Sequence, residues 1–259
     1  MSLEPFGCMR DSAPSFLAQD PSALGVAPLI ALCTAVIAIL FRINHLLVDA
    51  FVMPWLPRSF VARENTSASV TQKMTATVKS IGIAAAMNYV LWWDPYLEAD
   101  PSRALVLTTG TLFIAYEIAD LGVMTVYDTL TPDIACHHAI HIVLGLLLRT
   151  KCEMTALAPC LMAQETSSVF LNPFLLLRHR MPSSKSVRCL FGLFYCTFVA
   201  YRLRLNSVAT IHFVPLLCRR SGMLSTDRLT AFLVFAGMIL QWMWGVGITQ
   251  KIFRKVKAA

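Results

Sequence analysis

Charged residues are scarce in this chain of 259 residues, and this scarcity excludes an ordinary soluble domain. Asp, Glu, Lys and Arg make up 14% of the sequence, whereas a typical soluble domain contains about 25%. Hydrophobic residues make up 56%. These proportions predict an all-α membrane protein, because a membrane β-barrel would instead show alternating segments of about ten residues.

Sequence signatures of disulfide and zinc sites are also missing. The eight cysteines include no C-x-x-C pair, and the chain has no H-E-x-x-H motif. We therefore expect the cysteines to be reduced and buried, as small hydrophobic residues often are. We expect no metal site and no tightly bound cofactor.

The first 23 residues lack the basic stretch and apolar core of a secretory signal. Their mixed polar composition predicts a soluble extension that binds a neighbouring protein or lies along the membrane surface. The formal net charge of the whole chain is +7. Because the basic residues do not gather in one soluble patch, this excess favours contact with anionic lipid headgroups over nucleic acid. The expected partners are membrane lipids and a protein that contacts residues 1–23.

Long apolar runs are abundant, and seven of them predict membrane spans. They lie at residues 24–41, 75–93, 104–126, 133–148, 154–177, 189–203 and 229–249. Residues 204–228 mix four arginines with an apolar stretch at 211–217. That stretch is too short to cross a bilayer, so it is predicted to be interfacial or re-entrant. Within the fifth run, the pair Asn172-Pro173 predicts a kink.

Three consecutive runs hold ionisable residues. Asp120 lies in the third run, His137 and His138 lie in the fourth, and Glu165 lies in the fifth. A charged group inside a bilayer costs about 2.5–3.5 kcal/mol on insertion scales, so it usually faces a bundle interior or a water-filled cavity. Because spans joined by short loops pack side by side, we predict that these four residues form one intramembrane site.

The depth of each residue along its span tests this prediction roughly. At a rise of 1.5 Å per residue, Asp120 lies about 9 Å before the end of its span, and the histidine pair lies about 6–8 Å into the next one. Asp120 is therefore expected to approach His137 or His138. Glu165 lies about 20 Å from the end of its own span on the same scale, so it joins the site only if its helix bends or tilts.

Other polar residues extend the predicted site. Tyr116 and Glu117 share a helical face with Asp120. In the fourth run, His141 lies one turn after His137 on the same face. Ser168 and Asn172 follow Glu165 in the fifth run. We expect four of these residues to bind substrate: Tyr116, His141, Ser168 and Asn172.

Two interpretations of the acid and histidine cluster stay open at this point. A neutral imidazole beside a carboxylate acts as a general base, which makes His137, His138, Asp120 and Glu165 candidate catalytic residues. The same groups can instead form a polar network that holds the helices together without any chemistry, because interhelical hydrogen bonds do so in bilayers.

The run AYEIADLGVMTVYDTLTPDIACHHAIHIVLGLLL, at residues 115–148, resembles the core of the TLC domain. This domain is shared by ceramide synthases, translocon-associated proteins and a group of lipid-regulating membrane proteins. The matching features are Asp120 in one span and the His137-His138 pair that opens the next. The following span contains QETSSVFLNPFLLLR, which resembles the acidic/Ser, Phe, Asn pattern of the family. Weaker similarities are VTQKMTATVKSIG before the second span and Arg202 late in the sixth.

The resemblance implies a TLC-like transmembrane bundle at residues 69–253. The first transmembrane helix and its connecting loop then occupy residues 24–68, after the extension at 1–23, and a basic tail occupies residues 254–259. Ceramide synthases carry two aspartates after the histidine pair, whereas this chain has Glu165 and Ser168 in that register. The chain is therefore more similar to the divergent TLC proteins.

Two functions follow from the resemblance and the cluster together. The first is a multi-pass membrane protein that binds or processes sphingolipid or phospholipid acyl chains through the histidine and acid site. An enzyme of this kind would be acyltransferase-like, with acyl-CoA as co-substrate. The second is a non-catalytic structural subunit of a larger membrane assembly. The resemblance suggests the endoplasmic reticulum or another internal membrane, and the mitochondrial inner membrane is the alternative.

The charge distribution of the loops predicts the topology. Seven spans place the termini on opposite sides, and the basic residues 178–188 and the basic C-terminal tail mark the cytoplasmic or matrix side. Modification tags at Arg10 and Ser183 should therefore report opposite compartments. If both tags are modified from the same side of the membrane, the number of spans is wrong.

Overall fold

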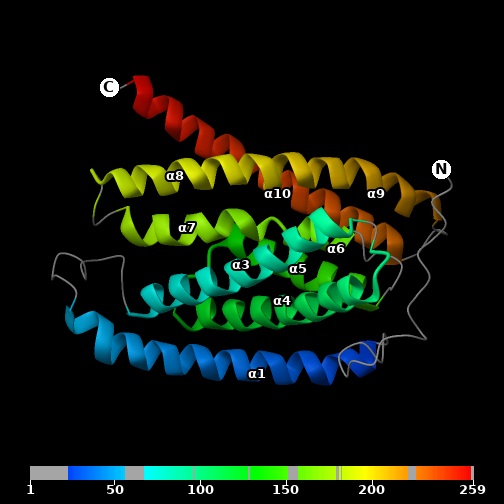
Figure 1. Cartoon of the computed structure of the whole chain (residues 1–259), viewed down its shortest axis with the longest axis horizontal. Coiled ribbons are helices and arrows are strands. Elements are labelled where there is room, and N and C mark those ends of the chain that lie inside the picture. The colour runs from blue at the N-terminus through cyan, green and yellow to red at the C-terminus, as the bar shows by residue number, and fades with distance from the viewer. Residues whose placement is uncertain are drawn as a thin grey trace.

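The computed structural model describes residues 23–55, 67–95, 97–127, 129–150, 157–178, 181, 183–220 and 226–257. Helices and short turns make up this described part of the chain (Figure 1). The α-helices are α1 (Ala23–Leu47), α3 (Ser67–Trp93), α4 (Asp100–Val126), α5 (Pro132–Thr150), α6 (Leu157–Met162), α7 (Glu165–Leu177), α8 (Lys185–Thr197), α9 (Asn206–Arg220) and α10 (Thr226–Lys257). Two further segments are π-helical, η1 (Val48–Val52) and η4 (Phe198–Leu205), and η2 (Met53–Trp55) is a 3-10 helix.

Several of these elements continue one another, so the residues that the structure describes form seven helical rods. The segments η1 and η2 extend α1, α7 follows α6 after a short break, and η4 joins α8 to α9. Six rods each contain one apolar run of the sequence, and the fifth contains the described part of the run at residues 154–177. The prediction of an all-α bundle of about seven helices is confirmed.

Three described helical segments are long and apolar enough to cross a membrane. They are Val26–Val52, Asp100–Val126 and Thr226–Ile252, with mean hydropathies of 2.4, 1.4 and 1.8. The outer face of α1 and its extension η1 illustrates the membrane character, since Ile39, Leu40 and Phe51 are all more than half exposed. An exposed apolar surface of this length suits lipid rather than water. The chain is therefore an all-α membrane protein.

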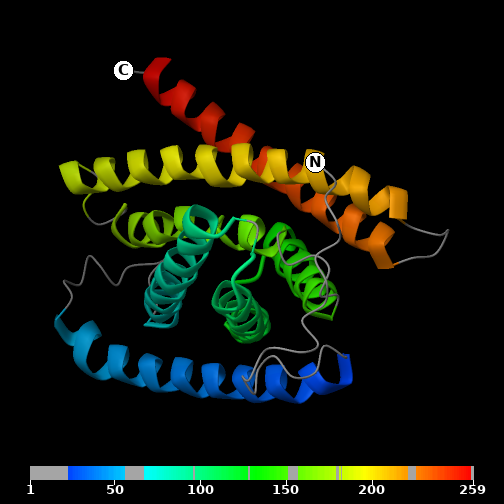
Figure 2. The same ribbon diagram turned by 45° about the vertical axis from the view of Figure 1, so that its right-hand side comes forward.

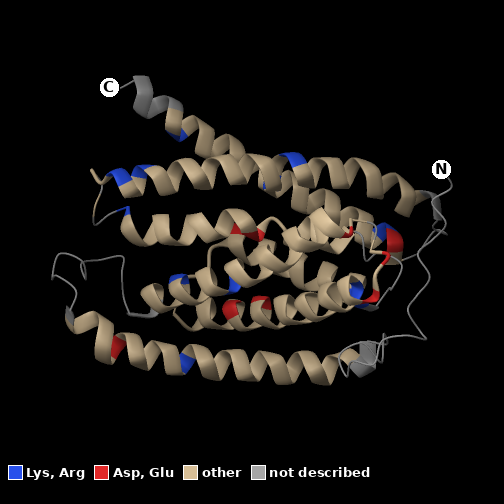
Figure 3. Cartoon of the chain, in the orientation of Figure 1, with Lys and Arg blue, Asp and Glu red and all other residues tan. Residues whose placement is uncertain are grey.

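The helices are arranged with α1 along one side and the rod formed by α8, η4 and α9 along the other (Figures 1 and 2). Between them lie α3, α4, α5 and α7, while α10 crosses the long rod and packs against α9 and α5. The closest partners of α3 and α4 are α7 and α1, respectively. Figure 3 shows the charged residues as isolated patches on ribbons that are otherwise uncharged.

The stretch at residues 204–228 differs from its predicted interfacial or re-entrant structure. In the described part of this stretch, the helix continues from α8 through η4 into α9 as far as Arg220. The prediction depended on the four arginines of the stretch and on its short apolar part at residues 211–217. In the structure Arg202 is buried and Arg204 is exposed, so one helix carries both the polar and the apolar residues.

The fifth rod breaks at a different place from the predicted one. The helix α7 runs through Asn172 and Pro173, and the break lies instead at residues 163–164, between α6 and α7. Two hydrogen bonds between residues three apart span this break. They run from the N–H of Thr166 to the carbonyl of Ala163 and from the N–H of Ser167 to the carbonyl of Gln164. The break brings Glu165 to the first position of α7, where it faces the middle of the bundle.

The remaining sequence predictions about segments and cysteines have mixed outcomes. The extension at residues 1–22 lies outside the described residues, and α10 extends to Lys257, which includes most of the expected basic tail. Cys33, Cys136, Cys189 and Cys196 carry free thiols. The expected burial is wrong for the last three, which are exposed on the outside of the helices.

The close contact between α4 and α5 generates a stability prediction. A Cβ atom added to Gly145 would lie 2.6 Å from Cγ1 of the buried Ile114, so the two helices would have to shift. We expect Gly145→Ala to lower the free energy of unfolding by about 1–3 kcal/mol. The control is Gly122→Ala on α4, where nothing lies within 4 Å and alanine is favoured by up to about 1 kcal/mol. Unfolding in mixed micelles, followed by tryptophan fluorescence, measures both, and equal stabilities would contradict the close packing.

Candidate functional site

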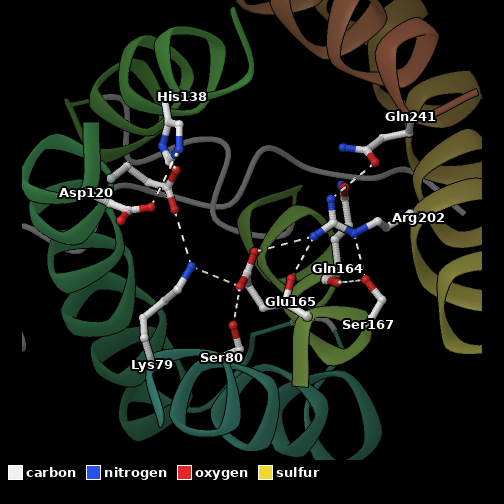
Figure 4. A network of polar contacts seen from close by, with 11 residues as sticks. Lys79, Ser80, Asp120, His138, Gln164, Glu165, Ser167, Arg202 and Gln241 are labelled. Atoms are coloured by element: carbon white, nitrogen blue, oxygen red, sulfur yellow. Dashed lines mark hydrogen bonds and ion pairs between the residues drawn. The ribbon is translucent and has the colours of Figure 1, made fainter. Parts of the chain in front are cut away.

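A lysine whose side chain is only 14% exposed joins two buried carboxylates in the middle of the bundle (Figure 4). The ammonium of Lys79 lies 2.9 Å from Oε2 of Glu165 and 3.3 Å from Oε1 of Glu117. The hydroxyl of the adjacent Ser80 donates a hydrogen bond of 2.6 Å to the same oxygen of Glu165. These residues come from α3, α4 and α7, so a single ammonium group holds three helices together.

His138 lies between two carboxylates of α4. Its Nδ1 atom is 2.6 Å from Oε2 of Glu117, and its Nε2 atom is 3.7 Å from Oδ2 of Asp120. The other oxygen of Asp120 accepts a hydrogen bond of 3.0 Å from the amide of Gln72. The structure thus brings Asp120 close to the histidine pair, at a distance longer than a hydrogen bond. The nearer acid is Glu117, which the sequence analysis placed on the same face but left out of the site.

Arg202 completes the network on the opposite side of Glu165 (Figure 4). Its guanidinium donates hydrogen bonds to Ser167 at 2.6 Å, to Ser168 at 2.8 Å and to Gln241 at 3.2 Å. It also lies 3.7 Å from Oε1 of Glu165. Arg202 belongs to the π-helical segment η4, and π-helical turns are frequent at functional sites because they redirect side chains.

The two other predicted histidines lie together on α5. Their ring centroids, those of His137 and His141, are 3.9 Å apart. His137 also contacts the ring of Trp244 at 5.1 Å, and His141 contacts the ring of Phe113 at 5.5 Å. Aromatic rings therefore surround both imidazoles.

The predicted substrate-binding residues have separate environments. The ring of Tyr116 lies 4.5 Å from the ammonium of Lys79, a cation–π contact. Ser168 is held by Arg202, as described above. Asn172 lies two turns after Glu165 on α7, and no hydrogen bond joins it to the network among the described residues. The structure thus groups Tyr116 and Ser168 with the charged residues, whereas Asn172 lies apart from them.

The sequence analysis did not assign three central residues of the network to the site: Lys79, Glu117 and Arg202. Lys79 and Arg202 lie within the two weaker similarities noted above, so the signal was present in the sequence. A second signal is energetic, because an unpaired charge inside a span is expensive and each acid there requires a cation.

A cavity of about 60 Å³ lies between α4, α5 and α6 and adjoins the network. Most of its lining residues are apolar, and its polar members are His141 and Arg149. The guanidinium of Arg149 donates a hydrogen bond of 3.2 Å to the hydroxyl of Thr111. The site therefore combines buried charges with an adjacent apolar space.

One group of side chains has the donor atoms that a metal ion needs. Glu117, His137 and His141 each offer a ligand atom, and these three atoms lie within 4.8 Å of one another. This group differs from the four predicted catalytic residues, of which it includes His137 alone.

The central ion pairs generate a second stability prediction. Lys79→Met leaves the carboxylates of Glu117 and Glu165 buried beside each other, and removal of one partner from a buried ion pair costs about 3–5 kcal/mol. We expect a loss of stability of this size, measured by unfolding in mixed micelles. The control is Lys251→Met, which removes an exposed lysine near the end of α10. Equal unfolding curves for the two variants would show that Lys79 does not stabilise the bundle.

The comparison with protein families agrees with the fold. The family model described as the TLC domain matches residues 65–250, which is 186 of the 259 residues. The match begins just before α3 and includes every residue of the charged network. A search of curated proteins found no match. Because the family model covers well over half of the chain, this protein belongs to the TLC-domain family.

Proposed function

We propose that this TLC-domain protein binds an acyl lipid, with the chain in the cavity between α4, α5 and α6 and the polar end toward the charged network. The observation that carries the proposal is the position of His141. Its side chain lines the apolar cavity and also contacts the tilted ring of His137, close to the buried Glu117. An amphipathic ligand needs such a junction of apolar and polar surface.

The free energy of binding would come mainly from the polar end of the lipid. An acyl chain that leaves the bilayer for an apolar cavity gains little, because lipid tails are as apolar as the side chains that line the cavity. Polar groups differ, since they find few hydrogen-bond partners among lipid tails. His141 and Arg149 are the polar residues of the cavity, so they would recognise the lipid headgroup or the carbonyl.

The size of the cavity limits what enters it. A dry cavity of about 150 Å³ is known to hold a benzene molecule, so a volume of about 60 Å³ holds part of an acyl chain. The remainder of the chain would extend along the outer surface of the helices into the bilayer. This arrangement suits a lipid that enters sideways from the membrane.

A proton-transfer role for His138 is the chemistry that the site offers beyond binding. An imidazole held by a carboxylate accepts a proton from an attacking group, and His138 contacts both Glu117 and Asp120. In an acyl transfer of the ceramide-synthase type, the amine nitrogen would bond to the acyl carbon of acyl-CoA while the thioester C–S bond breaks. His138 would take the proton from the attacking amine and return it to the departing CoA thiolate. Ser168 favours binding over this reaction, because it replaces the second aspartate of those enzymes and is occupied by Arg202.

Filling the cavity tests the proposal. Gly110 lines the cavity, and a Cβ atom there meets only Cε of Met162, at 3.9 Å. Gly110→Leu places a branched side chain in the space for the acyl chain, whereas Gly110→Ala fits and serves as the matched control. Lipid that co-purifies with each variant in mild detergent is quantified by mass spectrometry.

We expect Gly110→Ala to retain the same lipid as the unmodified protein. Gly110→Leu should retain on the order of one-tenth as much, equivalent to a loss of about 1.4 kcal/mol in binding free energy. Unfolding midpoints must be similar for the comparison to hold. If all three proteins retain equal amounts, the cavity does not bind lipid, and the network serves to hold the helices together, as in the structural-subunit alternative.

A further inference from the structure

Two imidazoles of the bundle have no part in the proton transfer described above. His137 and His141 lie four residues apart on α5, and this spacing places them on one face of the helix. Their ring centroids are 3.9 Å apart. The Nδ1 atom of His141 is buried and makes no hydrogen bond within the described part of the chain. A buried polar atom without a partner is costly, so it points to a ligand that the protein binds there.

A carboxylate from the neighbouring helix faces the two imidazoles. Glu117 of α4 is 2% exposed, and its Oε2 atom lies 2.6 Å from Nδ1 of His138. One ligand atom from each of Glu117, His137 and His141 lies within 4.8 Å of the others. Ligands about 2.1 Å from a tetrahedral ion are about 3.4 Å apart. Modest rotation of the imidazoles would therefore close the group around an ion.

We propose that Glu117, His137 and His141 bind a divalent transition-metal ion, with zinc as the best match. Two imidazoles and one carboxylate are the ligands of several catalytic zinc sites. Two histidines four residues apart on a helix are also the spacing found in H-E-x-x-H zinc sites. Here the carboxylate comes from a second helix, so a search for that motif in the sequence cannot detect the group.

Neighbouring side chains hold the carboxylate ligand in place. Lys79 contacts Oε1 of Glu117, and His138 contacts Oε2. A carboxylate oxygen has two lone pairs, so Oε2 can contact His138 and bind an ion at the same time. Partners of this kind fix the orientation of ligands in protein metal sites and tune metal affinity.

The charge of the site also suits a cation together with one anionic ligand. Three carboxylates (Glu117, Asp120 and Glu165) face two permanent cations (Lys79 and Arg202), which gives −3 + 2 = −1 when the imidazoles are neutral. A divalent ion changes this sum to +1, and one anion in the fourth coordination position changes it to zero. Because His141 lines the cavity, the fourth position would face that space. Hydroxide or a lipid carboxylate fits there.

Zinc binding is tested without lipid, so this inference and the proposed lipid function can fail independently. The full chain in detergent is stripped with a chelator and dialysed against zinc, and bound metal is measured by mass spectrometry. A competition titration then gives the dissociation constant. The variants are His137→Ala, His141→Ala and Glu117→Gln. The control is His212→Ala, which removes an exposed histidine of α9.

We expect one zinc ion per chain in the unmodified protein and in the His212→Ala control. Each of the three ligand variants should weaken binding at least about tenfold, since loss of even a supporting residue has that effect. An unmodified chain that retains no zinc after dialysis overturns the proposal, as does unchanged affinity in all three variants.

If the variants do not fold, a measurement on the unmodified protein still tests the proposal. X-ray absorption of the zinc-loaded chain should show a four-coordinate ion with two imidazole ligands at about 2.0–2.1 Å. A spectrum without imidazole scattering would place the zinc elsewhere and contradict the assignment.

Discussion

The ammonium of Lys79 is the contact on which the arrangement of the bundle depends. It bridges Glu117 and Glu165 from a third helix, in a region where water is scarce. Helices in a bilayer gain little from hydrophobic association, so polar contacts decide which helices pair and at what height. A buried ion pair adds little net stability compared with apolar packing, because desolvation is costly. Its effect here is to fix α3 against α4 and α7 in one register.

Much of the fold was predictable from hydropathy alone. Seven apolar runs became seven helical rods, because a chain inside a bilayer must satisfy its backbone hydrogen bonds within each helix. The boundaries were less predictable where polar residues lie inside a helix. The arginines of residues 204–228 favoured an interfacial or re-entrant segment, although the helix continues there as far as Arg220. Within this helix Arg202 is buried and paired, whereas Arg204 is exposed. Hydropathy treats these two arginines alike, whereas their environments are opposite.

The candidate site was predictable in part. Asp120 and His138 lie close to each other, and Glu165 reaches the same network through Lys79, although their roles stay predictions. Depth estimates could not locate the bend that brings Glu165 inward, because the break at residues 163–164 contains neither proline nor glycine. Depth estimates also could not show whether Glu117 or Asp120 lies nearer to His138, because the two acids are one helical turn apart. That choice depends on the rotation of α4, which packing determines.

The π-helical segment η4 has a consequence for comparisons between this protein and its relatives. A π-helical turn holds more residues than an α-helical turn, and each additional residue rotates the following helix by about 100°. An alignment that treats residues 185–220 as one regular α-helix would therefore assign the wrong faces to α9. Some positions that look lipid-facing on such an alignment would then be buried. A single-residue gap near Arg202 in a relative would mark a protein in which this guanidinium no longer points at Glu165.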